Sequence, residues 1–406
     1  MAFSHAWAQL KQAPHRMFFF TGMWQLAALA VWWAVLLTAR LAGIHIELVL
    51  PAVFLHGGAF LFLMFMPFMA GFLLTVMPRW QPAPPVPFRL QWFAFIGFNL
   101  GQILFLVGAH VSPMLVALGL GLLVIAWSTL LAGLASSLIR AQTRVIHAFG
   151  VLTGVLFGFA GLLLFLHAVT SGDWSSWPLM REIGIWCFLL PVYFSVSHRM
   201  VPFFSSRVVM GYQAWRPDGV LLAVLALSIL RGALSRWPEW AWLASVPLAL
   251  LLLLCSWKWW PRSRHGNALL SVLHLSLLWL GGGVALYALQ DLLPAFGVND
   301  LLGRAPLHVL GIGFFGGMLV SMVTRVSLGH SGRPLMLDRL SWLVFLTVQA
   351  SMLLRATGEI LVLNGLPQPY SLLMALAALA WLAAFVAWAT RFIGVYLQPR
   401  VDGAPG

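Results

Sequence analysis

The sequence predicts an all-α, polytopic membrane protein with twelve transmembrane helices. Of the 406 residues, 61% are hydrophobic and only 8% are charged, whereas roughly 25% of the residues in an average soluble domain are charged. A chain so poor in charge cannot cover a surface that faces water, so lipid must surround most of its exterior. Apolar runs of about 20 residues, the length that one helix needs to cross a bilayer, also recur along the whole chain.

The apolar runs define twelve spans, and the stretches between them are too short to hold a soluble domain. We therefore expect a single integral membrane domain over residues 1–406. The spans are expected at 17–39, 50–77, 91–110, 113–136, 144–168, 182–204, 218–235, 239–258, 267–290, 305–325, 339–360 and 370–397.

The basic residues predict the orientation of the chain. The net charge is +13, but the basic residues stand singly between apolar runs, which argues against nucleic acid as a partner and is typical of topology signals. When loops are assigned alternately, 17 of the 23 Lys and Arg residues fall on the side that holds both termini. We therefore expect both termini in the cytoplasm. The other side holds only Arg40, Arg181, Arg231, Arg236, Arg304 and Arg355.

A short string recurs along the chain and suggests an internal repeat. It ends three helices that run toward the expected cytoplasmic side, as TVMPR (75–79), SVSHR (195–199) and SMVTR (321–325). The final arginines lie 120 and 126 residues apart, which is the length of four spans with their loops. The alternative is chance coincidence in a sequence of low diversity. The spacing predicts three parallel repeats of four helices, at 17–136, 144–258 and 267–397.

Histidine, rather than acid, is the ionisable residue inside the predicted helices. Acidic side chains are nearly absent there, which argues against an ion-coupled transporter, since such proteins usually carry a carboxylate near mid-membrane. One buried histidine is as well explained by a hydrogen bond to a neighbouring helix. Five of them without acids indicate cofactor ligation, since neutral imidazole is a common metal and haem ligand. They are His56, His147, His198, His274 and His308.

Depth along the helices separates these histidines into two layers. His56 and His308 each lie a few residues into a span from the predicted outer side. At matched depth they could supply the two axial nitrogens of a low-spin haem. Arg231 and Arg355 lie on the same side, where haem propionates need charged partners. Ordinary interfacial charge is the alternative for these arginines, and for Arg304 it is the interpretation that we prefer.

The second layer lies near the predicted cytoplasmic ends of three spans. It consists of His147, His198 and His274, and three imidazoles from three helices suit copper, zinc or a second haem. His330 follows the tenth span on the same side and could join them, although its sequence context is that of a surface loop. Glycines at helical spacing follow His147 and permit either close helix packing or a slot for a planar macrocycle. They are Gly150, Gly154, Gly158 and Gly161.

Three segments carry a resemblance to a known family. They are HGGAFLFLMFMPFMAGFLLTVMPRW (56–80), LLPVYFSVSHRMVPFFSS (189–206) and HVLGIGFFGGMLVSMVTRVSLGHSGRP (308–334). In these segments, and over essentially its whole length, the chain resembles the NnrS family. Arg79 departs from the family pattern, which usually has asparagine at this position.

The resemblance implies a protein of the bacterial inner membrane that contains haem b and copper. It further implies a role in denitrification and in defence against nitric oxide and nitrosative stress. Nitric oxide or a similar diatomic molecule would be the ligand, and a quinol or a cytochrome the electron donor. The resemblance names the cofactors without assigning each histidine to one of them, and it leaves open whether the protein is an oxidoreductase.

The arrangement of twelve spans with histidines on the second, sixth and tenth is also similar to the catalytic subunits of haem–copper oxidases and nitric oxide reductases. In that family the second and tenth helices hold a low-spin haem near the outer side, and His56 and His308 match this placement. His198 does not match, since it lies near the cytoplasmic end of its span. This likeness is one of fold only.

Three functions are therefore in competition. The first is a haem and copper membrane protein that binds or turns over nitric oxide. The second is a haem protein for electron transfer or sensing without catalysis, whose spectrum nitric oxide leaves unchanged. The third is a transporter for a metal, haem or a small metabolite, with histidines along its path and a low, exchangeable metal content.

Overall fold

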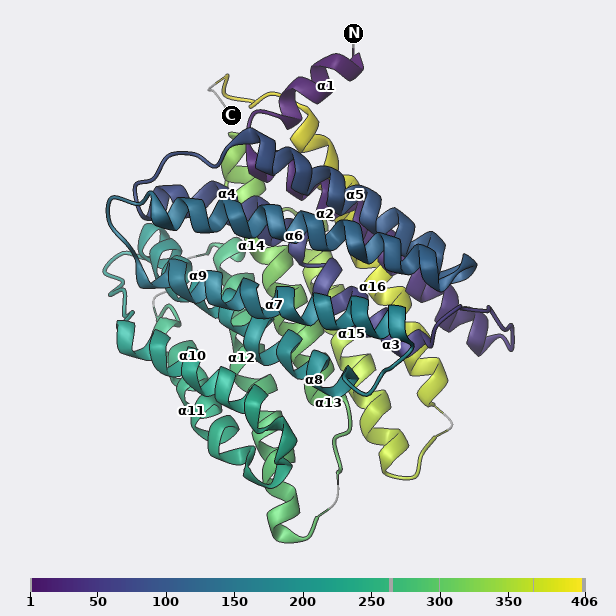
Figure 1. The fold of residues 1–406 in the computed structure, drawn as a ribbon. Coiled ribbons are helices and arrows are strands. Elements are labelled where there is room, and N and C mark those ends of the chain that lie inside the picture. Colours follow the sequence, from purple (N-terminus) through teal and green to yellow (C-terminus); the bar gives the residue numbers. More distant parts are fainter. Residues whose placement is uncertain (1, 263–265, 299, 368, 404–406) are drawn as a thin grey trace.

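The computed structural model describes residues 2–262, 266–298, 300–367 and 369–403. In this part of the chain it has twelve helices that are long and apolar enough to cross a membrane, as the sequence predicts. The chain is thus a multi-pass membrane protein. A short helix, α1 (Ala2–Leu10), precedes the first span. The N- and C-terminal segments lie near each other at the top of Figure 1. We call this end of the bundle the terminal end and the opposite end the far end.

Nine of the spans are built around one long α-helix each. They are α2 (Pro14–Leu41), α5 (Phe88–Val111), α6 (Pro113–Ile139), α7 (Ile146–Ser171), α10 (Asp218–Ala233), α11 (Trp242–Trp259), α12 (Ala268–Leu292), α15 (Arg339–Leu363) and α16 (Tyr370–Phe392).

The second, sixth and tenth spans each contain a π-helical segment. The second consists of α3 (Ala52–Gly58), η1 (Ala59–Leu63) and α4 (Met66–Trp80), the sixth of α8 (Trp177–Glu182), η2 (Ile183–Leu189) and α9 (Leu190–Val208), and the tenth of α13 (Ala305–His308), η6 (Val309–Gly316) and α14 (Gly317–His330). π-Helical turns are rare and often mark functional sites.

These three spans also form the interior of the bundle. In their most apolar windows 83%, 72% and 78% of the residues are buried, against 28–61% in the other nine spans. The nine outer spans therefore face lipid with much of their surface. A helix that is apolar on all sides is expected to lie in a protein core or in a membrane. The three inner spans are the first case and the nine outer spans are the second.

Pairwise packing arranges the spans in three sets of four. In the first, α15 packs on α16, α16 on α2, and α2 on α4. The second set joins α5, α6, α7 and α9 in the same way, and the third joins α10, α11, α12 and α14. Each set contributes one inner helix, so the three inner helices meet where the sets converge.

Glycine and a serine cap produce the tightest hairpin of the bundle, between α5 and α6. Only Ser112 separates the two helices, and its hydroxyl accepts a hydrogen bond from the Leu115 amide at 3.2 Å. A Cβ atom on Gly119 would lie 2.7 Å from the carbonyl oxygen of Gly101. The two backbones can approach this closely only because both positions lack a side chain.

Candidate functional site

A cavity of about 460 Å³ lies at the far end of the bundle. Residues of α2, of the three inner spans, and of α15 and α16 line it. Its wall is mostly apolar and aromatic, with a few charged groups, which is typical of a site for an organic cofactor. The basic side chains in the lining are His56, His308, Arg40, Arg181, Arg304 and Arg355.

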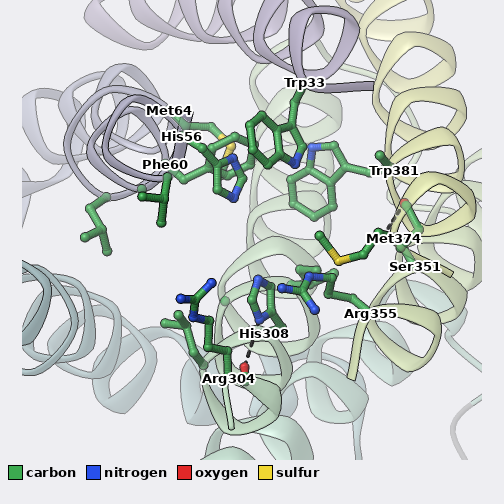
Figure 2. Close-up of a pocket in the computed structure, with 18 of the residues that line it drawn as sticks. Trp33, His56, Phe60, Met64, Arg304, His308, Ser351, Arg355, Met374 and Trp381 are labelled. Atoms are coloured by element: carbon green, nitrogen blue, oxygen red, sulfur yellow. Dashed lines mark hydrogen bonds between the residues drawn. The ribbon is translucent and has the colours of Figure 1, made fainter. Parts of the chain in front are cut away.

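The two histidines approach this cavity from different inner spans (Figure 2). The His56 ring stacks on Trp33, with 3.8 Å between centroids and 12° between planes, and its Nδ1 atom is buried without a hydrogen-bond partner in the described structure. The Nδ1 atom of His308 lies 2.8 Å from the carbonyl oxygen of Arg304. Since a carbonyl only accepts, Nδ1 must donate here, and the Nε2 atom of His308 keeps its lone pair.

Positive charge collects beside His308 (Figure 2). The Nη2 atom of Arg355 is 2.5 Å from Glu359, and the Tyr370 hydroxyl donates to the same carboxylate at 3.2 Å. The Nη1 atom of Arg355 is buried without a partner in the described part of the chain. Arg304, which the sequence analysis took for ordinary interfacial charge, lines the cavity instead. These two arginines are therefore able to bind anionic groups in the cavity.

Arg231, expected beside the same cofactor, lies elsewhere. Its Nε and Nη2 atoms form a bidentate pair with the carboxylate of Asp291 at 2.8 and 2.9 Å. Its Nη1 atom lies 3.4 Å from Glu182, and its guanidinium lies 5.2 Å from the Trp186 ring. This network ties the far ends of α8, α10 and α12 together. Arg231 thus has carboxylate partners and is not among the residues that line the cavity.

A second cluster lies near the terminal end, where His147 and His198 form a pair. The Nε2 atom of His147 is 3.0 Å from the Nδ1 atom of His198. Both side chains are buried. Aromatic rings surround them, with Trp80 at 6.4 Å from the His147 ring and Trp259 at 5.8 Å from the His198 ring. The pair is therefore shielded from water by large side chains.

Two glycines of α7 explain why the histidines meet. A Cβ on Gly150 would lie 2.5 Å from the Ser195 hydroxyl, and one on Gly154 would lie 2.7 Å from Val192. Both neighbours belong to α9, so the two helices are in close contact just beside the pair. Of the two roles that the sequence allowed for the glycines, close packing is the one observed, since side chains fill the space that a macrocycle would need.

The other two histidines of the predicted metal layer do not join the pair. The Nε2 atom of His274 lies 3.0 Å from the Ser205 hydroxyl. His330 is the last residue of α14 and lies against His15 of α2, with 4.3 Å between ring centroids. Within the described ranges, no three His, Cys, Asp or Glu side chains form a group able to hold a metal ion.

The sequence did not predict the contact between His15 and His330. The His15 side chain is only 3% exposed. The available signal was its position directly after Pro14, in the first turn of a long apolar helix. A histidine at this position is buried because it lies in the first turn of a helix that packs in the bundle.

Comparison with known proteins supports the resemblance noted in the sequence. No curated protein matches the chain. A family model described as NnrS protein matches residues 9–400, nearly the whole chain, and so includes both histidine clusters. The chain therefore belongs to the NnrS family.

Proposed function

We propose that the protein holds haem b in the far-end cavity and copper at the pair of His147 and His198, and that it acts in nitric oxide metabolism or nitrosative defence. We place it in the bacterial inner membrane with both termini in the cytoplasm. Membership of the NnrS family supports a function related to nitric oxide. The residues at the two sites support the assignment of the cofactors.

The far-end cavity fits a haem in its volume and in its donors. The single observation that carries the proposal is that His56 and His308, from two different inner spans, both line one cavity of about 460 Å³. The Nδ1 atom of His56 has no hydrogen-bond partner in the described structure, and His308 is oriented by its bond to the Arg304 carbonyl. Such an outer bond fixes the tautomer of a ligating histidine. Arg304 and the unpartnered Nη1 of Arg355 suit the two propionates.

The pair of His147 and His198 fits a copper ion as two of its ligands. The Nε2 atom of His147 and the Nδ1 atom of His198, which lie 3.0 Å apart, would be the nitrogens that hold the ion. Imidazole is a suitable ligand for copper.

The two sites would contribute different chemistry. A haem held by His56 and His308 would supply a one-electron centre, and a copper ion held by His147 and His198 would supply affinity for nitric oxide. The protein's own residues hold and shield these groups. Trp33 fixes the plane of the His56 ring, Arg355 anchors negative charge, and Trp80 and Trp259 exclude water from the histidine pair. A quinol or a cytochrome is the proposed electron donor.

We further propose that the bundle is a threefold repeat related to the haem–copper oxidases. The three packed sets of four spans, each with one inner helix that contains a π-helical segment, support this. The sets begin two spans away from the repeat boundaries at 17–136, 144–258 and 267–397. A period of four helices allows either starting point, because a repeat has no fixed beginning.

The experiment is to add nitric oxide to the purified, reduced protein and to its His198→Ala variant, with metal analysis of both. The proposal predicts about one copper per chain and nitric oxide binding in the wild type, and loss of both in the variant. Nitric oxide binding that persists in a copper-free variant would contradict it.

One observation favours a second function, non-catalytic electron transfer. His56 and His308 both line the cavity, and a haem held by the two imidazoles would transfer electrons without binding a diatomic ligand. If the histidine pair then binds no copper, the protein is an electron carrier. Its absorption spectrum would remain six-coordinate and unchanged by nitric oxide or carbon monoxide.

A further inference from the structure

A second, smaller cavity of about 60 Å³ lies among the three inner helices. On each of these helices, the residues that line the smaller cavity begin one turn after the last residue that lines the far-end cavity. Phe68 follows Phe65 on the second span, and Met318 follows Phe315 on the tenth. The two cavities are therefore neighbours along the bundle, the smaller one closer to the terminal end.

Three aromatic rings, one from each inner helix, separate the two cavities. Tyr193 lies 4.9 Å from Phe315 and 5.9 Å from Phe65, and the two phenylalanines lie 6.1 Å apart. Phe65 and Phe315 line the far-end cavity, whereas Tyr193 lines the inner one. This ring triad keeps a large ligand in the far-end cavity out of the inner cavity.

The chemistry of the lining restricts what the inner cavity can hold. Of its fourteen lining residues, only Tyr193 and Ser197 carry polar side chains, and none is charged. A buried water needs two to four polar partners, whereas cavities lined by aliphatic and aromatic groups stay dry and bind apolar molecules such as xenon. An ion such as nitrite would lose its hydration here without a compensating partner.

The volume restricts the ligand further. Roughly 10–15 Å³ of such space is enough for one water molecule, so 60 Å³ has room for a diatomic molecule or a xenon atom and excludes a ligand of cofactor size. On α9 the lining ends at Ser197, one residue before His198, and neither histidine of the pair lines the cavity.

We propose that the inner cavity is a binding site for one small, uncharged gas molecule of the diatomic class. The site lies next to the far-end cavity, on the terminal-end side of the ring triad. The proposal rests on the cavity alone and needs neither haem nor copper to be present. The test of this site is therefore independent of the test of the proposed function.

Crystals of the full chain under xenon pressure test the proposal, because xenon gives an anomalous diffraction signal. The wild type should show a xenon peak among Phe68, Val192 and Leu319. Leu319→Trp, which fills the cavity, should abolish the peak, and Leu319→Ala, which enlarges it, should increase the occupancy. The matched control is Leu346→Trp at an exposed position of α15, which should retain the peak.

Val192→Phe provides a second filling variant if Leu319→Trp does not fold, and it should likewise lose the peak. Absence of xenon from the wild-type cavity would overturn the proposal. So would ordered water or a lipid chain in the cavity, or equal xenon occupancy in the filled variant and its control.

Discussion

The Nε2 atom of His147 lies 3.0 Å from the Nδ1 atom of His198, across the contact between α7 and α9. The two residues are 51 positions apart in the chain. They meet because Gly150 and Gly154 allow the helices to touch beside them. A pair of nitrogen donors that is buried and surrounded by indole rings is the strongest candidate for a copper site in the described part of the chain.

His147→Ala and His198→Ala should each remove most of the bound copper, because either change leaves a single imidazole at the site. Haem content should stay unchanged, since the far-end cavity is lined by other residues. Inductively coupled plasma mass spectrometry of the purified variants measures this. His110→Ala, at an exposed histidine, is the control and should keep the wild-type copper content. Wild-type copper in both pair variants would disprove the assignment.

Gly154→Ala should destabilise the protein by about 1–3 kcal/mol, the usual cost of overpacking a closely packed interior. The added Cβ would lie 2.7 Å from Val192 and push α7 away from α9. Gly121→Ala is the matched control, because a Cβ there meets no atom within 4 Å, and its higher helix propensity should leave stability equal or slightly raised. Thermal unfolding in detergent compares them. Equal melting temperatures would show that the contact is not tight.

Arg231→Gln should destabilise the fold without lowering the haem content of the folded protein. The change leaves the half-buried Asp291 without its cation and Glu182 with Arg181 alone, so the cost should lie below the roughly 3–5 kcal/mol of breaking a fully buried pair. The arginine does not line the cavity, so the cofactor has no direct contact to lose. The measurements are the melting temperature and the haem-to-protein ratio after purification. A stable variant that lacks haem would instead support the role that the sequence suggested.

Asp338 should stabilise the start of α15 in a manner that depends on pH. Burial opposes its ionisation, but hydrogen bonds from Ser341 and the ion pair with Arg391 outweigh it and hold the pKa of the carboxyl below its ordinary value of 3.8. The stabilisation is therefore complete above that value and is lost as the pH falls through the lowered pKa.

Hydrogen exchange of the first turn of α15 measures this contribution at neutral pH. Asp338→Ala should increase exchange there, whereas Asp338→Asn, which retains a capping oxygen, should increase it less. Equal exchange in both variants and the wild type would show that the cap contributes nothing.

The sequence predicts well how deep each residue lies in the membrane, because the lengths of the apolar runs and the positions of the charges can be read directly along the chain. It predicts twelve spans, and it matches His56 with His308, which line one cavity. It does not predict which way each helix is rotated. Lipid is as apolar as the protein interior, so a helix in a membrane has little amphipathic pattern to show its inner face.

The positions of Arg231, Arg304 and His274 illustrate this limit. Arg231 and Arg304 both lie toward the far end, and only helix rotation and loop path decide that the second one lines the cavity. His274 has the expected depth but lies on Ser205 rather than in the histidine pair. The contact between His15 and His330 joins helices from opposite ends of the sequence, so no local pattern could indicate it.

The reduced-minus-oxidised absorption spectrum of the purified protein, with haem quantified by pyridine extraction, tests the central claim most directly. The account predicts a six-coordinate, low-spin haem in the wild type. His56→Ala and His308→Ala should each lose this signature, and His198→Ala should retain it. An unchanged spectrum and haem content in both of the first two variants would contradict the assignment of the far-end cavity as the haem site.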